Sequence, residues 1–139
     1  MKGFAIFALC IVAVSAGIVD HEACGGAGQV RQVRISDCEG VVAEMRQGVE
    51  YAVEADVVPA ASSAGLHLKV TVVFMGNTIP IIDAVVPNSA VQPGVQYTLQ
   101  WSITPGAIPV GNTVPVTSEV SDAASTTVLM CARITARII

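Results

Sequence analysis

Aromatic and charged side chains are scarce in this chain of 139 residues. Aromatic residues make up 4% of the sequence and charged residues 13%, whereas 53% of the residues are hydrophobic. Seven Lys and Arg residues against eleven Asp and Glu residues give a formal net charge of −4. Nucleic-acid binding depends on positive charge gathered on one surface, and the sequence has no basic cluster. The composition therefore argues against a nucleic-acid partner.

The sequence also lacks the common motifs of catalytic and metal sites. It contains no Gly-x-Ser-x-Gly, His-Glu-x-x-His or P-loop motif, and no Cys-x-x-Cys pair of the kind that holds zinc. His21 precedes the first expected strand, and His67 falls on the polar side of another. Cys38 stands between Asp37 and Glu39, whose charges raise the pKa of a thiol and disfavour a reactive thiolate. We expect no enzyme activity, no cofactor and no metal site.

One long hydrophobic run is present, and it lies at the amino terminus. The stretch MKGFAIFALCIVAVSAG has an early Lys2, an unbroken apolar segment and then small residues. This order is typical of a secretory signal peptide, and the run is shorter than the ~20 residues of a membrane span. We predict a signal peptide over residues 1–16 and a mature domain over residues 17–139, with a retained anchor as the alternative.

Few cysteines would remain after removal of the signal peptide. Cys10 would leave with the signal peptide, and Cys24, Cys38 and Cys131 would stay. One disulfide and one free thiol is the simplest arrangement of three cysteines in an oxidising compartment. A bridge from Cys24 to Cys131 would close a loop of about 107 residues and contribute ~3–5 kcal/mol in the chain-entropy view. The sequence has no N-glycosylation motif, so extracellular residence is favoured over the lysosomal lumen.

The residues after the amino-terminal run show the period of two that is typical of half-buried β-strands. In LHLKVTVVF, apolar Leu66, Leu68, Val70, Val72 and Phe74 alternate with a second set that is mostly polar. Similar segments are separated by turn signals such as Gly76-Asn77, Pro93-Gly94 and Pro105-Gly106. The strands expected on this basis cover residues 29–36, 49–58, 66–75, 95–103, 114–120 and 127–139.

This spacing of short strands predicts a single all-β domain. About seven strands, rich in β-branched residues and separated by Gly and Pro, favour an immunoglobulin-like antiparallel β-sandwich. The segment GVVAEMRQG, residues 40–48, could form a short helical turn instead of a strand. The alternation leaves open whether the inward faces close on each other as an ordinary core or line a hollow.

Several segments, taken in order, resemble one family. Cys24 and Cys38 are followed by GVEY, FMGNTIPI and QPGVQYTLQW, and the chain ends with VLMCARITARI. This order is similar to that of the ML lipid-recognition domain of the Niemann-Pick type C sterol carriers and the mite group-two allergens. The resemblance covers the whole predicted mature chain. It implies a secreted immunoglobulin-like sandwich whose sheets splay apart around an apolar cavity that holds a sterol, a fatty acid or a similar lipid.

The resemblance also implies a disulfide framework, and this chain departs from it. Cys24 is implied to pair with Cys131. In the family, the second cysteine usually bonds a partner that would lie near Ala43 in this chain, so Cys38 is left without a partner. The segment VVPNSAVQPG has no cysteine, so the family's remaining bridge is missing as well. Of the three disulfides that the family usually has, one is expected here. We therefore expect looser loops at the entrance.

The inward positions of the expected strands give the candidate lipid site. The predicted cavity walls are Val33, Ile35, Val53, Val57, Leu68, Val70, Val72, Phe74, Leu99, Trp101, Val116, Met130 and Ile134. The predicted cavity mouth consists of Ile79, Ile81, Tyr97, Ile103, Ile108 and Val110. The hydroxyl of Tyr97 could meet a lipid head group or simply point to water at the edge of the core.

The sequence thus supports two functions from different classes. The first is a secreted, monomeric lipid-binding or lipid-transfer protein, with transient contact to a membrane or a receptor. The second is an immunoglobulin-like interaction or lipid-sensing co-receptor module, allergen-like, without a carrier role. A carrier should release extractable lipid when it is purified, whereas an adhesion domain should not.

Overall fold

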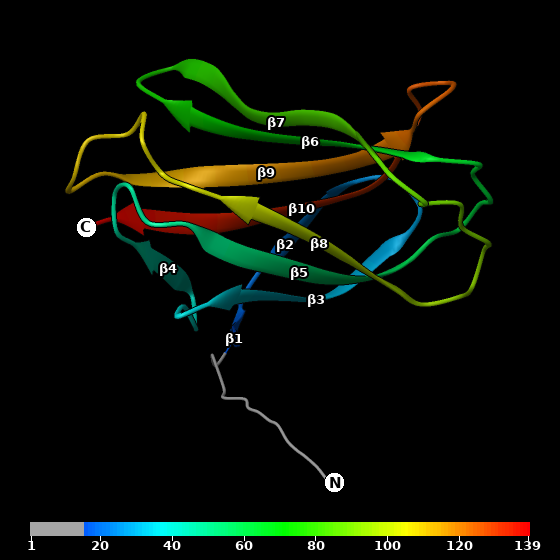
Figure 1. Cartoon of the computed structure of the whole chain (residues 1–139), viewed down its shortest axis with the longest axis horizontal. Helices are drawn as coiled ribbons and strands as arrows, with labels where there is room; N and C mark the ends of the chain where they lie inside the picture. Colours follow the sequence, from blue (N-terminus) through cyan, green and yellow to red (C-terminus); the bar gives the residue numbers. More distant parts are fainter. Residues whose placement is uncertain (1–15) are drawn as a thin grey trace, which may run out of the picture.

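The computed structural model describes residues 16–139 as ten β-strands in two packed layers (Figure 1). Within that range no helix has the length and apolarity that crossing a membrane requires. The strands are β1 Ala16–Val19, β2 Glu22–Gly25, β3 Gln29–Ser36, β4 Val42–Met45, β5 Tyr51–Val58, β6 Leu66–Phe74, β7 Asn77–Val86, β8 Tyr97–Ile103, β9 Thr113–Asp122 and β10 Val128–Ile138.

The strands form two sheets that face each other. The four-stranded sheet has the order β1-β3-β5-β8, and the six-stranded sheet has the order β2-β10-β9-β6-β7 with β4 paired to β10. Neighbouring strands are antiparallel except β4 and β10, which run parallel. The predicted β-sandwich is confirmed, with ten strands in place of about seven.

The strands that the sequence did not predict are short or irregular. β1, β2 and β4 have four residues each, too few for a period of two to be recognised. The helical turn considered for residues 40–48 is wrong, because Val42–Met45 pairs with β10 as a strand. β7 is an edge strand with a mostly exposed pattern and Pro80 in its interior, so it does not alternate.

The inward side chains of both sheets make one apolar core. Along β5, Tyr51, Val53, Ala55 and Val57 are buried while the residues between them are more exposed. The same alternation holds along β6 and β10. Each layer therefore presents an apolar face to the other, as in other aligned sandwiches.

The outward face of the four-stranded sheet carries a polar network centred on Arg34 of β3. Its guanidinium donates two hydrogen bonds to Asp56, at 2.7 and 3.0 Å, and one to Glu54 at 3.2 Å. Thr98 of β8 donates to Asp56 at 2.8 Å. The hydrogen bonds from Arg34 and Thr98 hold the pKa of Asp56 below its usual range. The network ties β3, β5 and β8 together and faces solvent, so it leaves the inner face apolar.

The beginning of the described chain is part of the fold. A Cβ atom at Gly17 would lie 1.8 Å from the carbonyl oxygen of Cys38, so only glycine fits where β1 passes this backbone. The Gly40 N–H donates to the Ile18 carbonyl, and the Asp20 N–H donates to the Gly40 carbonyl, both at 2.9 Å. The predicted domain boundary at residues 16 and 17 therefore falls at the first residues of β1. Residues 1–15 of the predicted signal peptide lie outside the described part.

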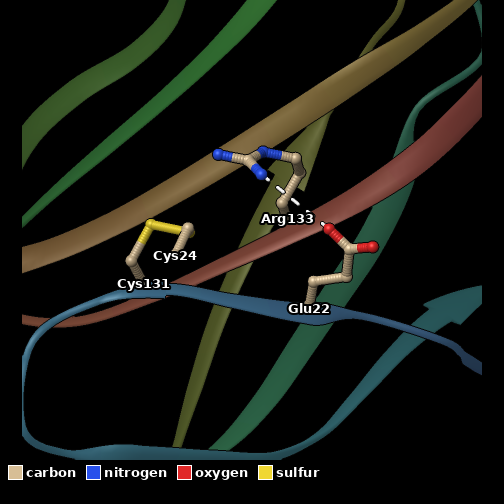
Figure 2. The surroundings of a disulfide bond; sticks show 4 residues. All are labelled: Glu22, Cys24, Cys131 and Arg133. Atoms are coloured by element: carbon tan, nitrogen blue, oxygen red, sulfur yellow. Dashed lines mark ion pairs between the residues drawn. A yellow bond between two sulfur atoms is a disulfide. The ribbon is translucent and has the colours of Figure 1, made fainter.

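One disulfide fastens β2 to β10 on the six-stranded sheet (Figure 2). Cys24 and Cys131 are bonded, as the resemblance implied. Glu22 and Arg133 form an ion pair at 3.8 Å on the same two strands. The bond joins residues that are 107 positions apart and so links the start of the domain to its last strand.

Candidate functional site

A small apolar cavity lies between the two sheets near the centre of the sandwich. Its volume is about 30 Å³. Strands β3, β5 and β8 line it from one layer, and β6, β9 and β10 line it from the other. The lining residues are Val30, Val33, Ile35, Val53, Ala55, Val57, Val70, Leu99, Trp101, Ile103, Val116, Ser118, Val120, Met130, Ala132 and Ile134.

A second apolar cavity of about 40 Å³ lies toward the end of the sandwich that carries the loop between β8 and β9. In Figure 1 this is the end at the left, where the β6–β7 turn and the carboxyl terminus also lie. Val70, Ile103 and Val116 line both cavities, so the two voids are neighbours along one inter-sheet path. The remaining residues are Met45, Val72, Ile81, Thr104, Pro105, Gly106, Ala107, Ile108, Val114, Ala136 and Ile138.

The structure places the predicted wall residues as follows. Ten line the central cavity: Val33, Ile35, Val53, Val57, Val70, Leu99, Trp101, Val116, Met130 and Ile134. Val72 lines the second cavity. Leu68 is buried and Phe74 is half-buried against the core, but neither lines a cavity.

The predicted mouth residues do not all meet. Ile81, Ile103 and Ile108 line the second cavity. Val110 is 61% exposed and Ile79 packs against the edge of the core. Tyr97 begins β8 and so lies at the opposite end of that strand from Ile103.

Tyr97 bonds a loop at the exposed edge of the sandwich, which is compatible with a hydroxyl that also meets water. Its hydroxyl accepts a hydrogen bond from the Gln92 N–H at 2.9 Å and therefore fixes the loop before β8. Because that loop lies at the far end of the sandwich from the second cavity, a head-group contact there would need a different entrance. The alternation indicated that Tyr97 is half-buried, but it carried no information about which end of the sandwich is open.

Several lining residues were missed by the sequence reasoning. Ala55, Val120 and Ala132 follow the same alternation as their predicted neighbours and could have been included. Met45 belongs to β4, which was not expected to be a strand. Ser118 gave no hydrophobic signal, although it occupies an inward position.

A β-bulge turns Ile81 toward the second cavity. In the pairing of β6 with β7, Val70 is opposite Ile82 and Thr71 is opposite Pro80, so Ile81 is the extra residue. Pro80 has no N–H to donate and is tolerated because β7 is the outer strand of its sheet. This irregularity brings an edge-strand side chain to the rim of the inter-sheet space.

The two long margins of the sandwich differ. On one margin lie β1, which is the edge of the four-stranded sheet, and β2 and β4, which both pair with β10, and Val19 of β1 forms a bridge with Gly40 just before β4. On the other margin, β7 pairs with β6 and β8 pairs with β5, and the described residues include no strand pairing between β7 and β8. The layers can therefore separate more easily along the β7 and β8 margin than along the other.

Hydrogen bonds join the loops at the end of the sandwich opposite the second cavity. Ser63 and Val91 exchange two backbone hydrogen bonds, at 3.1 and 2.9 Å. The Ser89 hydroxyl accepts a bond from the Leu66 N–H at 2.8 Å and donates to the Val86 carbonyl at 2.6 Å.

The other end is tied as well, because the Gly48 N–H donates to the Pro105 carbonyl at 2.7 Å and the Gln47 side-chain amide donates to the Ile108 carbonyl at 3.0 Å. The presence of the second cavity, and not a lack of hydrogen bonds, therefore distinguishes that end.

Cys38 is a buried free thiol away from both cavities. It is 6% exposed, and its sulfur donates to the Glu44 carbonyl at 3.4 Å. Burial, together with the charges of Asp37 and Glu44, raises its pKa to about 11. The expected direction is confirmed, with burial as the main cause and Glu44 in place of Glu39 as the second carboxylate. Such a thiol is protonated and unreactive at neutral pH.

This raised pKa predicts a loss of stability at high pH. Between the ordinary thiol pKa of 9.0 and about 11, the unfolded chain releases the Cys38 proton while the folded chain keeps it, so the free energy of unfolding falls. The drop should reach at most about 2–3 kcal/mol. Urea unfolding at pH values from 8 to 11 measures this drop in the free energy of unfolding. Cys38→Ala has no thiol at this position, so the part of the pH dependence that comes from Cys38 should be missing. An identical pH profile for both proteins would contradict the assignment.

Both histidines in the described part of the chain have partners outside the two cavities. His67 of β6 pairs with Asp83 of β7 at 2.6 Å on the outward face, and the His21 ring nitrogen lies 2.9 Å from the Val30 carbonyl. Among the described residues no cluster of His, Cys, Asp or Glu is arranged to hold a metal ion. The chemistry available between the sheets is therefore apolar burial with very few polar contacts.

Comparison with known proteins identifies the fold. No protein-family model matches this chain, and no curated protein sequence matches it. A solved structure of a Niemann-Pick type C2 protein from the Japanese carpenter ant is similar with a TM-score of 0.71 and 14% identity, over 86% of this chain and 99% of that one. Chicken MD-1, solved in complex with lipid IVa, is similar with a TM-score of 0.55 and 16% identity, over 83% and 85% of the two chains.

The fold is also found outside these proteins. The C-terminal domain of wzt is similar with a TM-score of 0.61 and 9% identity, over 86% of this chain and 77% of that domain. At such low identities the likeness shows the fold alone. The resemblance to the ML lipid-recognition domain is confirmed at that level: the chain has the fold of the ant and chicken proteins.

Proposed function

We propose that this protein is a secreted lipid-binding protein that holds one apolar chain or ring system between its two sheets. The observation that carries the proposal is the pair of neighbouring apolar cavities, which share Val70, Ile103 and Val116 and lead from one end of the sandwich to its centre. The likeness to the Niemann-Pick type C2 protein and to MD-1, which was solved with lipid IVa, supports the same function. Sterols and fatty acids are the ligand classes that this lining fits.

The volumes require the sheets to separate when a ligand enters. Cavities of about 30 and 40 Å³ are far smaller than the roughly 300–1,000 Å³ of ligand pockets. Separation along the β7 and β8 margin enlarges the space without breaking a strand pair, because no pairing between β7 and β8 is found among the described residues. Ile81 and Ile108 lie where such an opening would begin.

The energy of binding comes from removing the ligand from water. A long acyl chain or a sterol that buries a few hundred Å² gains ~25 cal/mol per Å² of apolar surface. The net binding free energy is this gain less the cost of immobilising the ligand and of separating the sheets. Few polar contacts are needed for affinity, and selectivity comes from the shape of the cavity and from its rare polar groups.

The segment over residues 1–16 and the Cys24–Cys131 bond support a secretory route. The bond is stable in an oxidising compartment, and the amino-terminal run has the order of a signal peptide. We propose that the mature domain is extracellular and monomeric, and that it acts without enzyme chemistry.

The second candidate, an interaction or sensing module with a closed core, is favoured by the small volume of the cavities. The two functions differ in what the purified protein contains. We expect organic extraction and mass spectrometry of protein secreted from eukaryotic cells to release one lipid per chain. We also expect delipidated protein to bind a fluorescent sterol or fatty acid at one per chain. Absence of both would reject the carrier and leave the module.

A further inference from the structure

Resting on the proposed lipid binding, we propose that Ser118 selects lipids that carry a hydroxyl or carbonyl oxygen within their hydrocarbon part. Ser118 lies in the middle of β9 and lines the central cavity. Ser118 is half-buried, whereas the valines of the same strand phase are buried.

The register of β9 shows that the position is an inward one. Val114, Val116 and Val120 alternate with more exposed residues and are buried, and Ser118 falls in the same phase. Of the five positions of β9 in this phase, three carry valine and the last is Asp122 at the end of the strand. The hydroxyl of Ser118 therefore interrupts a row of valines in the middle of the strand. Such local exceptions are expected at functional sites.

The surroundings offer this hydroxyl almost no polar partner. Val70 of β6 and Ala132 of β10 lie directly opposite Ser118 on the two neighbouring strands. Of the sixteen residues that line the central cavity, Trp101 has the only other side-chain nitrogen or oxygen, and it comes from the facing sheet. A trapped water needs two to four polar partners, so a ligand oxygen is the better match for Ser118.

The depth of Ser118 indicates which part of the ligand it meets. Four residues separate it from Val114, which lines the outer cavity, and at roughly 3.3 Å per residue this is about 13 Å along the strand. The first half of a long acyl chain spans that distance. The oxygen recognised by Ser118 is therefore expected near the middle of the chain, away from the head group.

The test compares two fatty acids that differ by one oxygen. Stearic acid and 12-hydroxystearic acid have the same chain length and the same carboxyl group. Each is titrated against the delipidated protein carrying N-phenyl-1-naphthylamine as a fluorescent reporter, and the displacement gives the affinity. We expect the wild type to prefer the hydroxylated acid about three- to tenfold, the range that one neutral hydrogen bond provides.

Two variants of equal volume isolate the hydroxyl. Ser118→Thr keeps the oxygen and adds a methyl group, whereas Ser118→Val has the shape of the threonine variant with a second methyl group in place of the hydroxyl. We expect the preference to persist in the threonine variant and to vanish in the valine variant, which should keep its affinity for stearic acid and unfold at a higher temperature. Equal affinities in the wild type, or a preference that survives in Ser118→Val, overturn the role of Ser118 while lipid binding stands. Binding of neither acid by the wild type also overturns the role of Ser118, and if a fluorescent sterol does not bind either, the proposed function is overturned as well.

Discussion

Replacing both Cys24 and Cys131 with serine is expected to lower the free energy of unfolding by ~3–5 kcal/mol. The bond joins positions 107 residues apart, so its loss frees nearly the whole domain in the unfolded state. It also leaves β2, a strand of four residues, held on β10 only by its short backbone pairing and by the exposed ion pair of Glu22 with Arg133. Urea unfolding followed by circular dichroism at pH 7 measures the loss.

Cys38→Ser is the matched control for this experiment. It changes the same atom, but the thiol is unbridged, and a serine oxygen can still donate to the Glu44 carbonyl. We expect a loss of about 1 kcal/mol, within the range of a single buried substitution. Losses of equal size in the two proteins would show that Cys38 belongs to the native bridge.

The strands that could be predicted are those with one face in the core and one in solvent. The segments around Val53, Val70 and Met130 alternate because each strand pairs on both sides and is wetted on one face only. β7 escaped prediction because its pattern is interrupted at Pro80 and shifted by the bulge at Ile81. A period of two in the sequence arises when burial alternates along a strand, and burial does not alternate regularly along an edge strand with a bulge.

The site could be predicted less well than the fold. Alternation assigned Val33, Leu99 and Ile134 to the inner face, but inner-face residues look alike whether they pack closely or border a void. Nothing in the sequence indicated which strand ends lie beside the second cavity, so Tyr97 was grouped with Ile108 although they lie at opposite ends of the sandwich. Only the relative placement of the two sheets locates the cavities.

Ile81→Asp is expected to weaken binding of a neutral apolar ligand at least tenfold. The side chain is 38% exposed and lines the second cavity from the bulge of β7, at the margin where the sheets can part. A carboxylate there replaces apolar contact with a group that must stay hydrated, and a tenfold loss corresponds to only about 1.4 kcal/mol. Direct titration with N-phenyl-1-naphthylamine measures the effect, because this probe carries no charge that the aspartate could repel.

Val85→Asp is the matched control on the same strand. Val85 is 62% exposed and lines neither cavity, so the same new charge should change the affinity less than twofold. Val72→Trp fills the second cavity from β6 with a larger side chain. This variant should also abolish lipid uptake if the sandwich stays folded. Normal loading by both Ile81→Asp and Val72→Trp, with intact circular dichroism spectra, would mean that lipid does not pass between β7 and β8. Equal losses in Ile81→Asp and Val85→Asp would trace the effect to surface charge instead of the bulge.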